Sequence, residues 1–101
     1  MTVNVTLLYF DGCPNWQQTE QRLLDALDQA GLPPTVLTRQ AVRTPEDAER
    51  LRFRGSPTVL INGQDPFADP DAPVELSCRI FQTPDGLAGA PTVGQLVTVL
   101  R

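Results

Sequence analysis

The sequence of 101 residues contains no histidine. Without an imidazole, the chain cannot build a cysteine–histidine dyad, a serine–histidine–aspartate triad or a zinc site with histidine ligands. Any thiol that reacts in this protein must therefore be activated by backbone dipoles or by other side chains.

Long apolar segments and an excess of positive charge are also missing. No uninterrupted apolar run approaches the roughly 20 residues that a membrane span requires. The N-terminus, MTVNVTLLYF, has neither a basic region nor a small-residue cleavage site, so we do not interpret it as a signal peptide. The net charge of −4 argues against nucleic acid and against an anionic membrane as partners. We expect a cytoplasmic protein.

Cysteine is scarce: the sequence contains 2 cysteines, Cys13 and Cys78. Cysteines without a secretory signal fit a reducing cytosol, where thiols serve in catalysis or metal binding more often than in structural disulfides. The length and the hydrophobic fraction of 41% are typical of a single domain, residues 1–101, that folds without cross-links. We expect no cofactor.

The hydrophobic pattern predicts that strands and helices alternate. Residues 3–10 are rich in β-branched and aromatic side chains, as in a central strand that is apolar on both faces. A first helix follows, with Cys13 as its N-cap, Pro14 as its first residue and Gly31 at its end. Its inner face is predicted from apolar residues at helical spacing: Trp16, Leu23, Leu24 and Leu27.

The rest of the chain predicts further strands over residues 35–42, 58–61 and 77–82. Helices are expected after the capping residues Thr44 and Thr92. The acidic, proline-rich stretch 64–76 is interpreted as a solvated loop, because its spacing does not match a calcium-binding loop. The order β-α-β-α-β-β-α predicts an α/β fold with a central mixed four-stranded sheet. The first strands should be parallel, the last pair antiparallel, and helices should cover both faces.

Cys13 stands at the junction between the first strand and the first helix, in the stretch YFDGCPNW. An N-cap cysteine points its sulfur at the unpaired N–H groups of the first turn and at the positive end of the helix dipole, and both favour the thiolate. Open α/β sheets also bind ligands at the carboxyl ends of their strands. We favour a reactive thiol over a small buried residue, because cysteine is not a preferred N-cap.

The element order, with CPNW at the first helix and GSPT before the third strand, resembles the thioredoxin-like superfamily over nearly the whole chain. In that family a reactive cysteine precedes proline at the same junction, and a cis-proline loop packs against it. The resemblance implies a thioredoxin-like fold in which Cys13 and Pro57 face each other. Ser56 would offer backbone groups to a bound thiol or peptide, which makes Ser56, Pro57 and Thr58 candidates for substrate binding.

Trp16 stands where that family has its second cysteine, which argues against dithiol thioredoxin activity. The spacing of Trp16 with Leu23 and Leu27 favours a role in the core. A partly exposed tryptophan beside the thiol could instead shape a substrate pocket, so Trp16 is also a candidate for substrate binding.

Cys78 opens the predicted strand 77–82, next to the strand that follows Pro57. Alternation places Cys78 and Ile80 on one face of it, and a second functional thiol and a buried core cysteine are equally consistent with this pattern. A weaker similarity, to the thioredoxin-like core of organomercurial (alkylmercury) lyases, favours the functional thiol. In those enzymes two cysteines bind mercury, and an aspartate supplies the proton that cleaves the carbon–mercury bond. Trp16 occupies the position of that aspartate.

Three functions therefore remain open. The first is thiol–disulfide exchange, in which Cys13 attacks a thiol or disulfide substrate, a protein or a small molecule, and Cys78 resolves the mixed disulfide. The second is binding of a soft metal such as mercury, or of an organomercurial, by the Cys13/Cys78 pair. The third is a redox-inert binding module. The separation of the cysteines is decisive, since Cα atoms within ~7 Å permit a disulfide.

Overall fold

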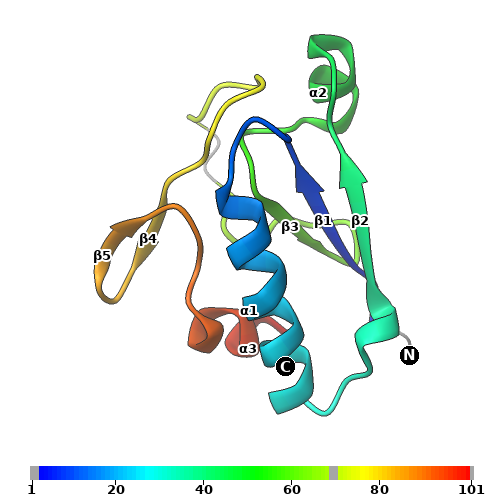
Figure 1. Cartoon of the computed structure of the whole chain (residues 1–101), viewed down its shortest axis with the longest axis vertical. Helices are drawn as coiled ribbons and strands as arrows, with labels where there is room; N and C mark the ends of the chain where they lie inside the picture. Colours follow the sequence, from blue (N-terminus) through cyan, green and yellow to red (C-terminus); the bar gives the residue numbers. More distant parts are fainter. Residues whose placement is uncertain (1–2, 69–70, 101) are drawn as a thin grey trace.

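The computed structural model describes residues 3–68 and 71–100 (Figure 1). It is a mixed α/β structure, as the hydrophobic pattern predicts. The elements are β1 (Val5–Tyr9), α1 (Asn15–Gln29), the 3-10 helix η1 (Pro34–Val36), β2 (Leu37–Ala41), α2 (Pro45–Leu51), β3 (Thr58–Ile61), β4 (Phe81–Thr83), β5 (Gly86–Ala88) and α3 (Val93–Leu100). Within the described ranges, no helix has the length and the apolar character that crossing a membrane requires.

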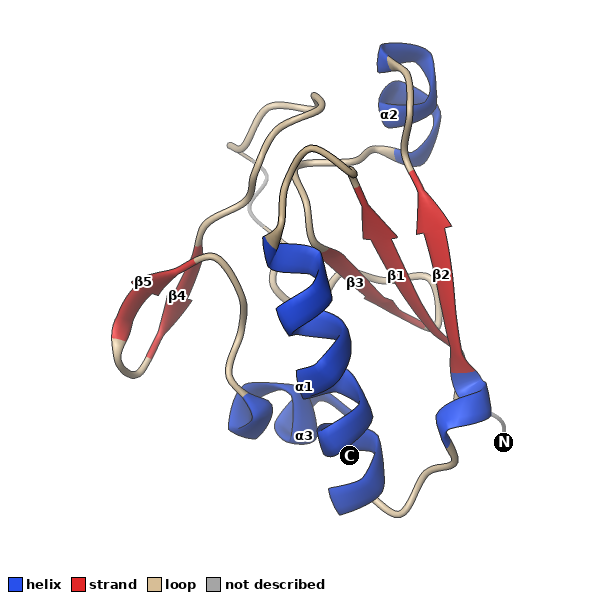
Figure 2. Ribbon diagram, viewed as in Figure 1, coloured by secondary structure: helices blue, strands red, loops and turns tan. Residues whose placement is uncertain are grey.

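The central sheet has three strands in the order β2-β1-β3 (Figure 2). β1 and β2 are parallel, with Val5 opposite Leu37, so the expected parallel β-α-β unit is present. β3 runs antiparallel to β1, with Leu7 opposite Val59. β1 is apolar on both faces because it is the central strand, and both Leu7 and Leu8 are buried.

The predicted four-stranded sheet is wrong, because residues 77–82 do not extend it as a fourth strand. The loop after β3 leads the chain back to the beginning of that strand, where the N–H of Glu75 donates to the carbonyl oxygen of Phe53. The chain therefore meets Ser56 in the parallel direction, and one isolated bridge joins Ser56 to Cys78. It then enters the separate β4–β5 hairpin, which stands apart from the sheet in Figure 1.

Two clusters of buried side chains lie on opposite faces of the sheet. Leu7 and Leu8 belong to different clusters because successive side chains of a strand point to opposite faces. Helices therefore contribute to both faces, with α1 and α3 on one and α2 at one end of the other (Figure 2). The larger cluster contains Val5, Leu7, Leu23, Ala26, Leu27, Val59, Leu96 and Leu100. The smaller one contains Leu8, Val42, Ala48 and Phe53.

The N-terminus of α1 differs from the prediction by one residue. The N-cap is Pro14, whose backbone is already helical, so the prediction of Cys13 as the N-cap is wrong. The physical reason is a turn: the N–H of Cys13 donates to the carbonyl oxygen of Phe10 at 3.0 Å, which holds Cys13 outside the helix. At the other end Gly31 has a φ of 74°, and the next N–H returns to the carbonyl oxygen of Leu27, as expected for a glycine stop.

We expect Leu23→Ala to lower the free energy of unfolding by about 2–5 kcal/mol, because it deletes a fully buried side chain that joins α1 to the sheet. Leu87→Ala is the control. Its side chain is 74% exposed, so the change should stay within about 0.5 kcal/mol. Urea denaturation of both oxidised variants measures the difference, and equal losses would contradict the placement of Leu23 in the core.

Candidate functional site

Cys13 and Cys78 form a disulfide, with 5.8 Å between their Cα atoms. The bond joins the loop before α1 to the segment that follows the long acidic loop, and the two residues are 65 positions apart in sequence. Their separation lies within the ~7 Å that a disulfide allows. Cys78 therefore reaches Cys13 in the folded chain.

The two halves of the disulfide differ in exposure. Cys13 is 0% exposed, and its Sγ lies 3.6 Å from the carbonyl oxygen of Ser56. Cys78 is exposed. The alternation expected for residues 77–82 does occur, but it buries Arg79 and Phe81 and leaves Cys78 on the solvent side. The interpretation of Cys78 as a buried core cysteine is therefore wrong.

Ser56 connects the two cysteines through its backbone. Its N–H donates to the carbonyl oxygen of Ser77 at 2.7 Å, and its carbonyl oxygen accepts the N–H of Arg79 at 2.9 Å. Its hydroxyl oxygen accepts the N–H of Phe10 at 3.0 Å. The backbone groups that the resemblance assigns to a bound thiol or peptide are thus paired with residues 77–79, which we call the Cys78 segment.

Pro57 and Thr58 lie beneath the surface next to this connection. The Ser56–Pro57 peptide bond is cis, and Pro57 is fully buried. Thr58 is 3% exposed and donates its hydroxyl to the carbonyl oxygen of Gly55 at 2.7 Å. Both residues are enclosed in the oxidised protein.

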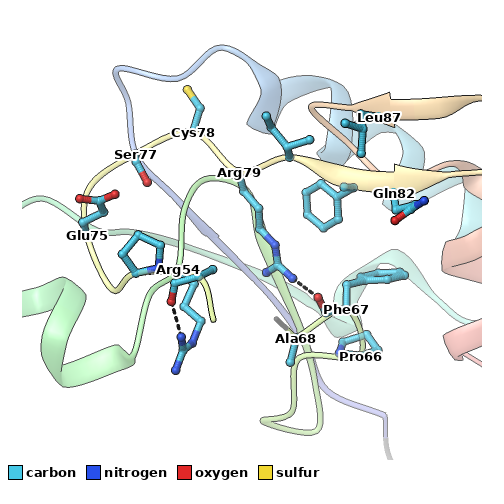
Figure 3. Close-up of a pocket in the computed structure, with 14 residues that line it drawn as sticks. Arg54, Pro66, Phe67, Ala68, Glu75, Ser77, Cys78, Arg79, Gln82 and Leu87 are labelled. Atoms are coloured by element: carbon cyan, nitrogen blue, oxygen red, sulfur yellow. Dashed lines mark hydrogen bonds between the residues drawn. The ribbon is translucent and has the colours of Figure 1, made fainter. Parts of the chain in front are cut away.

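A pocket of about 800 Å³ opens beside Cys78 (Figure 3). Figure 3 shows the Cys78 sulfur and the Arg79 guanidinium on opposite sides of the Cys78 segment. Ile80 and Leu87, which are 68% and 74% exposed, line the same pocket. Exposed apolar surface therefore adjoins the accessible cysteine.

Trp16 lies elsewhere, in a stack at the junction of α1 and the sheet. Its ring is 4.3 Å from that of Tyr9, between centroids, and the guanidinium of Arg39 lies 5.8 Å from its centroid. The ring packs half-buried against the larger cluster. This placement agrees with the core interpretation of Trp16, and the described residues that line the pocket beside Cys78 do not include it.

An ion pair that the sequence pattern did not reveal holds the Cys78 segment in place. The Nη1 of Arg79 donates to the Oδ2 of Asp65 at 2.6 Å, and the two side chains are 7% and 16% exposed. The guanidinium also donates to the carbonyl oxygen of Phe67 and lies 4.6 Å from the ring centroid of Phe81. The alternation of residues 77–82 could have predicted this pair, because an arginine on the inner face of a strand requires a partner.

The expectation of a solvated loop over residues 64–76 is therefore wrong at Asp65, which is sheltered by Arg79. The described part of this stretch contains no helix or strand, as predicted. Residues 69 and 70 lie outside the described ranges.

No protein-family model matches the chain, and comparisons with the curated proteins and with the solved structures found no match either. The site is therefore interpreted from its own geometry. In the parts of the chain that the structure describes, no group of three or more histidine, cysteine, aspartate or glutamate side chains could hold a metal ion. The site contains one disulfide between an enclosed and an exposed cysteine.

Arg79→Gln should lower the free energy of unfolding by about 3–5 kcal/mol, because it leaves the sheltered Asp65 carboxylate without its cation. Arg50→Gln is the matched control. The Arg50–Asp47 pair lies at the surface, with Arg50 63% exposed, so its loss should cost less than about 1 kcal/mol. Urea denaturation of the two oxidised variants compares them directly. Similar losses in both would show that the Arg79 pair has no special role.

Proposed function

We propose that this protein is a thiol–disulfide redox protein whose reactive bond joins Cys13 and Cys78. The observation that carries the proposal is the unequal exposure of the two cysteines. Exposed disulfides are typically the labile, regulatory or catalytic ones, whereas structural disulfides resist reduction. The proposed substrates are thiols and disulfides of proteins or of small molecules.

The arrangement around the bond supports a thioredoxin-like interpretation. Cys13 lies between the central strand β1 and α1, at the carboxyl end of that strand, and the loop that leads into β3 packs Ser56 against its sulfur. Two features depart from the resemblance: Trp16 replaces the second cysteine, and the fourth strand is missing from the sheet. Cys78 supplies the second sulfur from a different element.

The redox cycle transfers two electrons. Two external thiols reduce the bond: Cys13 and Cys78 become thiols, and the external sulfurs are joined as a disulfide. In the opposite direction the two cysteine thiols give two electrons and two protons to a substrate disulfide, which becomes two thiols, and the Cys13–Cys78 bond forms again.

Contacts other than the disulfide also position Cys78. The Ser56 backbone pairs with Ser77 and Arg79, and the Arg79–Asp65 ion pair fixes the same segment. The two thiols are therefore held near each other for re-oxidation. In the chain-entropy model, a disulfide across 65 positions stabilises a fold by about 4 kcal/mol. By linkage, folding raises the equilibrium constant for formation of the disulfide by about a thousandfold.

The reduction potential tests the proposal, because that stabilisation could also make the bond resistant to reduction. We expect a potential above about −300 mV, within the range of disulfides that exchange with cellular thiols. The oxidised protein is equilibrated in glutathione buffers of graded ratio, quenched with acid, alkylated and weighed as the intact chain. A potential well below about −300 mV would identify the bond as structural and contradict the proposal.

A second candidate function uses the same two sulfurs. With Cα atoms 5.8 Å apart, the reduced cysteines are close enough to bind one soft ion, such as Hg²⁺ or Cu⁺, between two thiolates. Cleavage of an organomercurial, as in the alkylmercury lyases, would also require an acid beside the metal. Trp16 provides none at the position of the lyase aspartate, so the alternative that we propose is binding.

Reduced wild-type protein should bind one equivalent of Hg²⁺, since soft thiolates suit a soft metal. Cys78→Ala should weaken that binding by at least about tenfold, because one of the two ligands is lost. Titration against a competing dithiol chelator, followed by thiolate–mercury absorbance, measures both affinities. Binding of equal strength in Cys78→Ala would rule out a two-thiolate site.

A further inference from the structure

We infer that Cys78, and not Cys13, is the sulfur that exchanges with the redox partner. This inference rests on the proposed redox function and reverses the roles that the sequence suggests for the two cysteines. Exchange requires an external thiolate to reach one sulfur of the disulfide while the other sulfur leaves, so access decides which sulfur is attacked. Cys13 is 0% exposed and Cys78 is exposed.

Cys13 makes two contacts besides its bond to Cys78. Its N–H donates to the carbonyl oxygen of Phe10 at 3.0 Å, which closes the turn before α1. Its sulfur lies 3.6 Å from the carbonyl oxygen of Ser56, in the buried loop that leads into β3. Neither contact is made with Cys78.

Cys78 occupies the solvent side of its segment. The buried Arg79 side chain holds the segment through its ion pair with Asp65. The Cys78 sulfur is directed away from the Arg79 guanidinium (Figure 3). The exposed side chains of Ile80 and Leu87 lie along the same pocket. An external thiolate would approach the Cys78 sulfur from the side away from the Arg79 guanidinium.

Reduction of the disulfide by a dithiol partner begins at Cys78. The thiolate of a dithiol partner bonds to the Sγ of Cys78, the Cys13–Cys78 bond breaks, and its electron pair leaves on the Sγ of Cys13. Cys13 directly precedes the N-cap of α1, where the positive end of the helix dipole favours a leaving thiolate. The partner's second thiolate then attacks its own sulfur in the mixed disulfide, which releases Cys78 as a thiolate and leaves the partner oxidised.

In the opposite direction the order of events is reversed. The Cys78 thiolate attacks a substrate disulfide and expels one substrate thiolate. The Cys13 thiolate then attacks the Sγ of Cys78, displaces the second substrate thiolate and restores the Cys13–Cys78 bond. Cys78 is thus the exchanging sulfur in both directions, and Cys13 is the resolving one.

Single-cysteine variants test this assignment with glutathione disulfide as the probe. Reduced Cys13→Ser, which retains Cys78, should form the glutathione adduct at least about tenfold faster than Cys78→Ser, which retains Cys13, because access controls the rate. Intact mass after acid quenching measures the adduct. In concentrated urea the two rates should converge, since the difference arises from the fold and not from the neighbouring residues.

A second measurement uses the wild-type protein. Oxidised protein is treated briefly with reduced glutathione, quenched with acid, alkylated and mapped by peptide mass. Glutathione should be found on Cys78 and the alkyl group on Cys13. The reverse arrangement, or faster reaction of the variant that retains Cys13, would overturn the assignment but leave the redox function intact. A disulfide that stays intact, with neither glutathione nor an alkyl group on either cysteine, would overturn the redox function, and the assignment with it.

Discussion

The backbone pairing of Ser56 with the Cys78 segment is the interaction on which the site depends. Two hydrogen bonds, to Ser77 and from Arg79, place Cys78 beside the loop that leads into β3. The same serine accepts a hydrogen bond from the backbone of Phe10 and lies against the sulfur of Cys13. Three segments that are distant in the sequence therefore meet at one residue, and the disulfide forms where they meet.

Stability and reactivity of this disulfide have different physical origins. Its stability comes from proximity, because the Ser56 pairing and the Arg79–Asp65 ion pair hold the segment in place. Its reactivity comes from access, because Cys78 is on the exposed side and Cys13 is enclosed. A buried ion pair adds little net stability compared with apolar packing, but it is costly to break. Here the Arg79–Asp65 pair fixes the position of the Cys78 segment, which is not a strand of the central sheet.

Much of the fold follows from local patterns in the sequence. β3 covers the predicted residues 58–61, since Pro57 precedes it and the turn at Asn62, with a φ of 53°, ends it. α3 begins with the expected capping box, in which the backbone N–H groups of Thr92 and Gln95 each donate to the other's side chain, at 2.9 and 3.1 Å. Residues 77–82 show the limit of such patterns. Their alternation correctly separates two faces, but it does not identify what this segment pairs with.

The sequence by itself determined the α/β class, the positions of α1, β3 and α3, and the place of Cys13 just before a helix, because each of these depends on residues a few positions apart. Only the tertiary structure decided that Cys78 bonds to Cys13, that Asp65 pairs with Arg79, and which of the two cysteines is enclosed. These features bring together residues that are distant in sequence, 65 positions apart for the two cysteines and 14 for Asp65 and Arg79. Such contacts depend on the path of the whole chain, which no local pattern encodes.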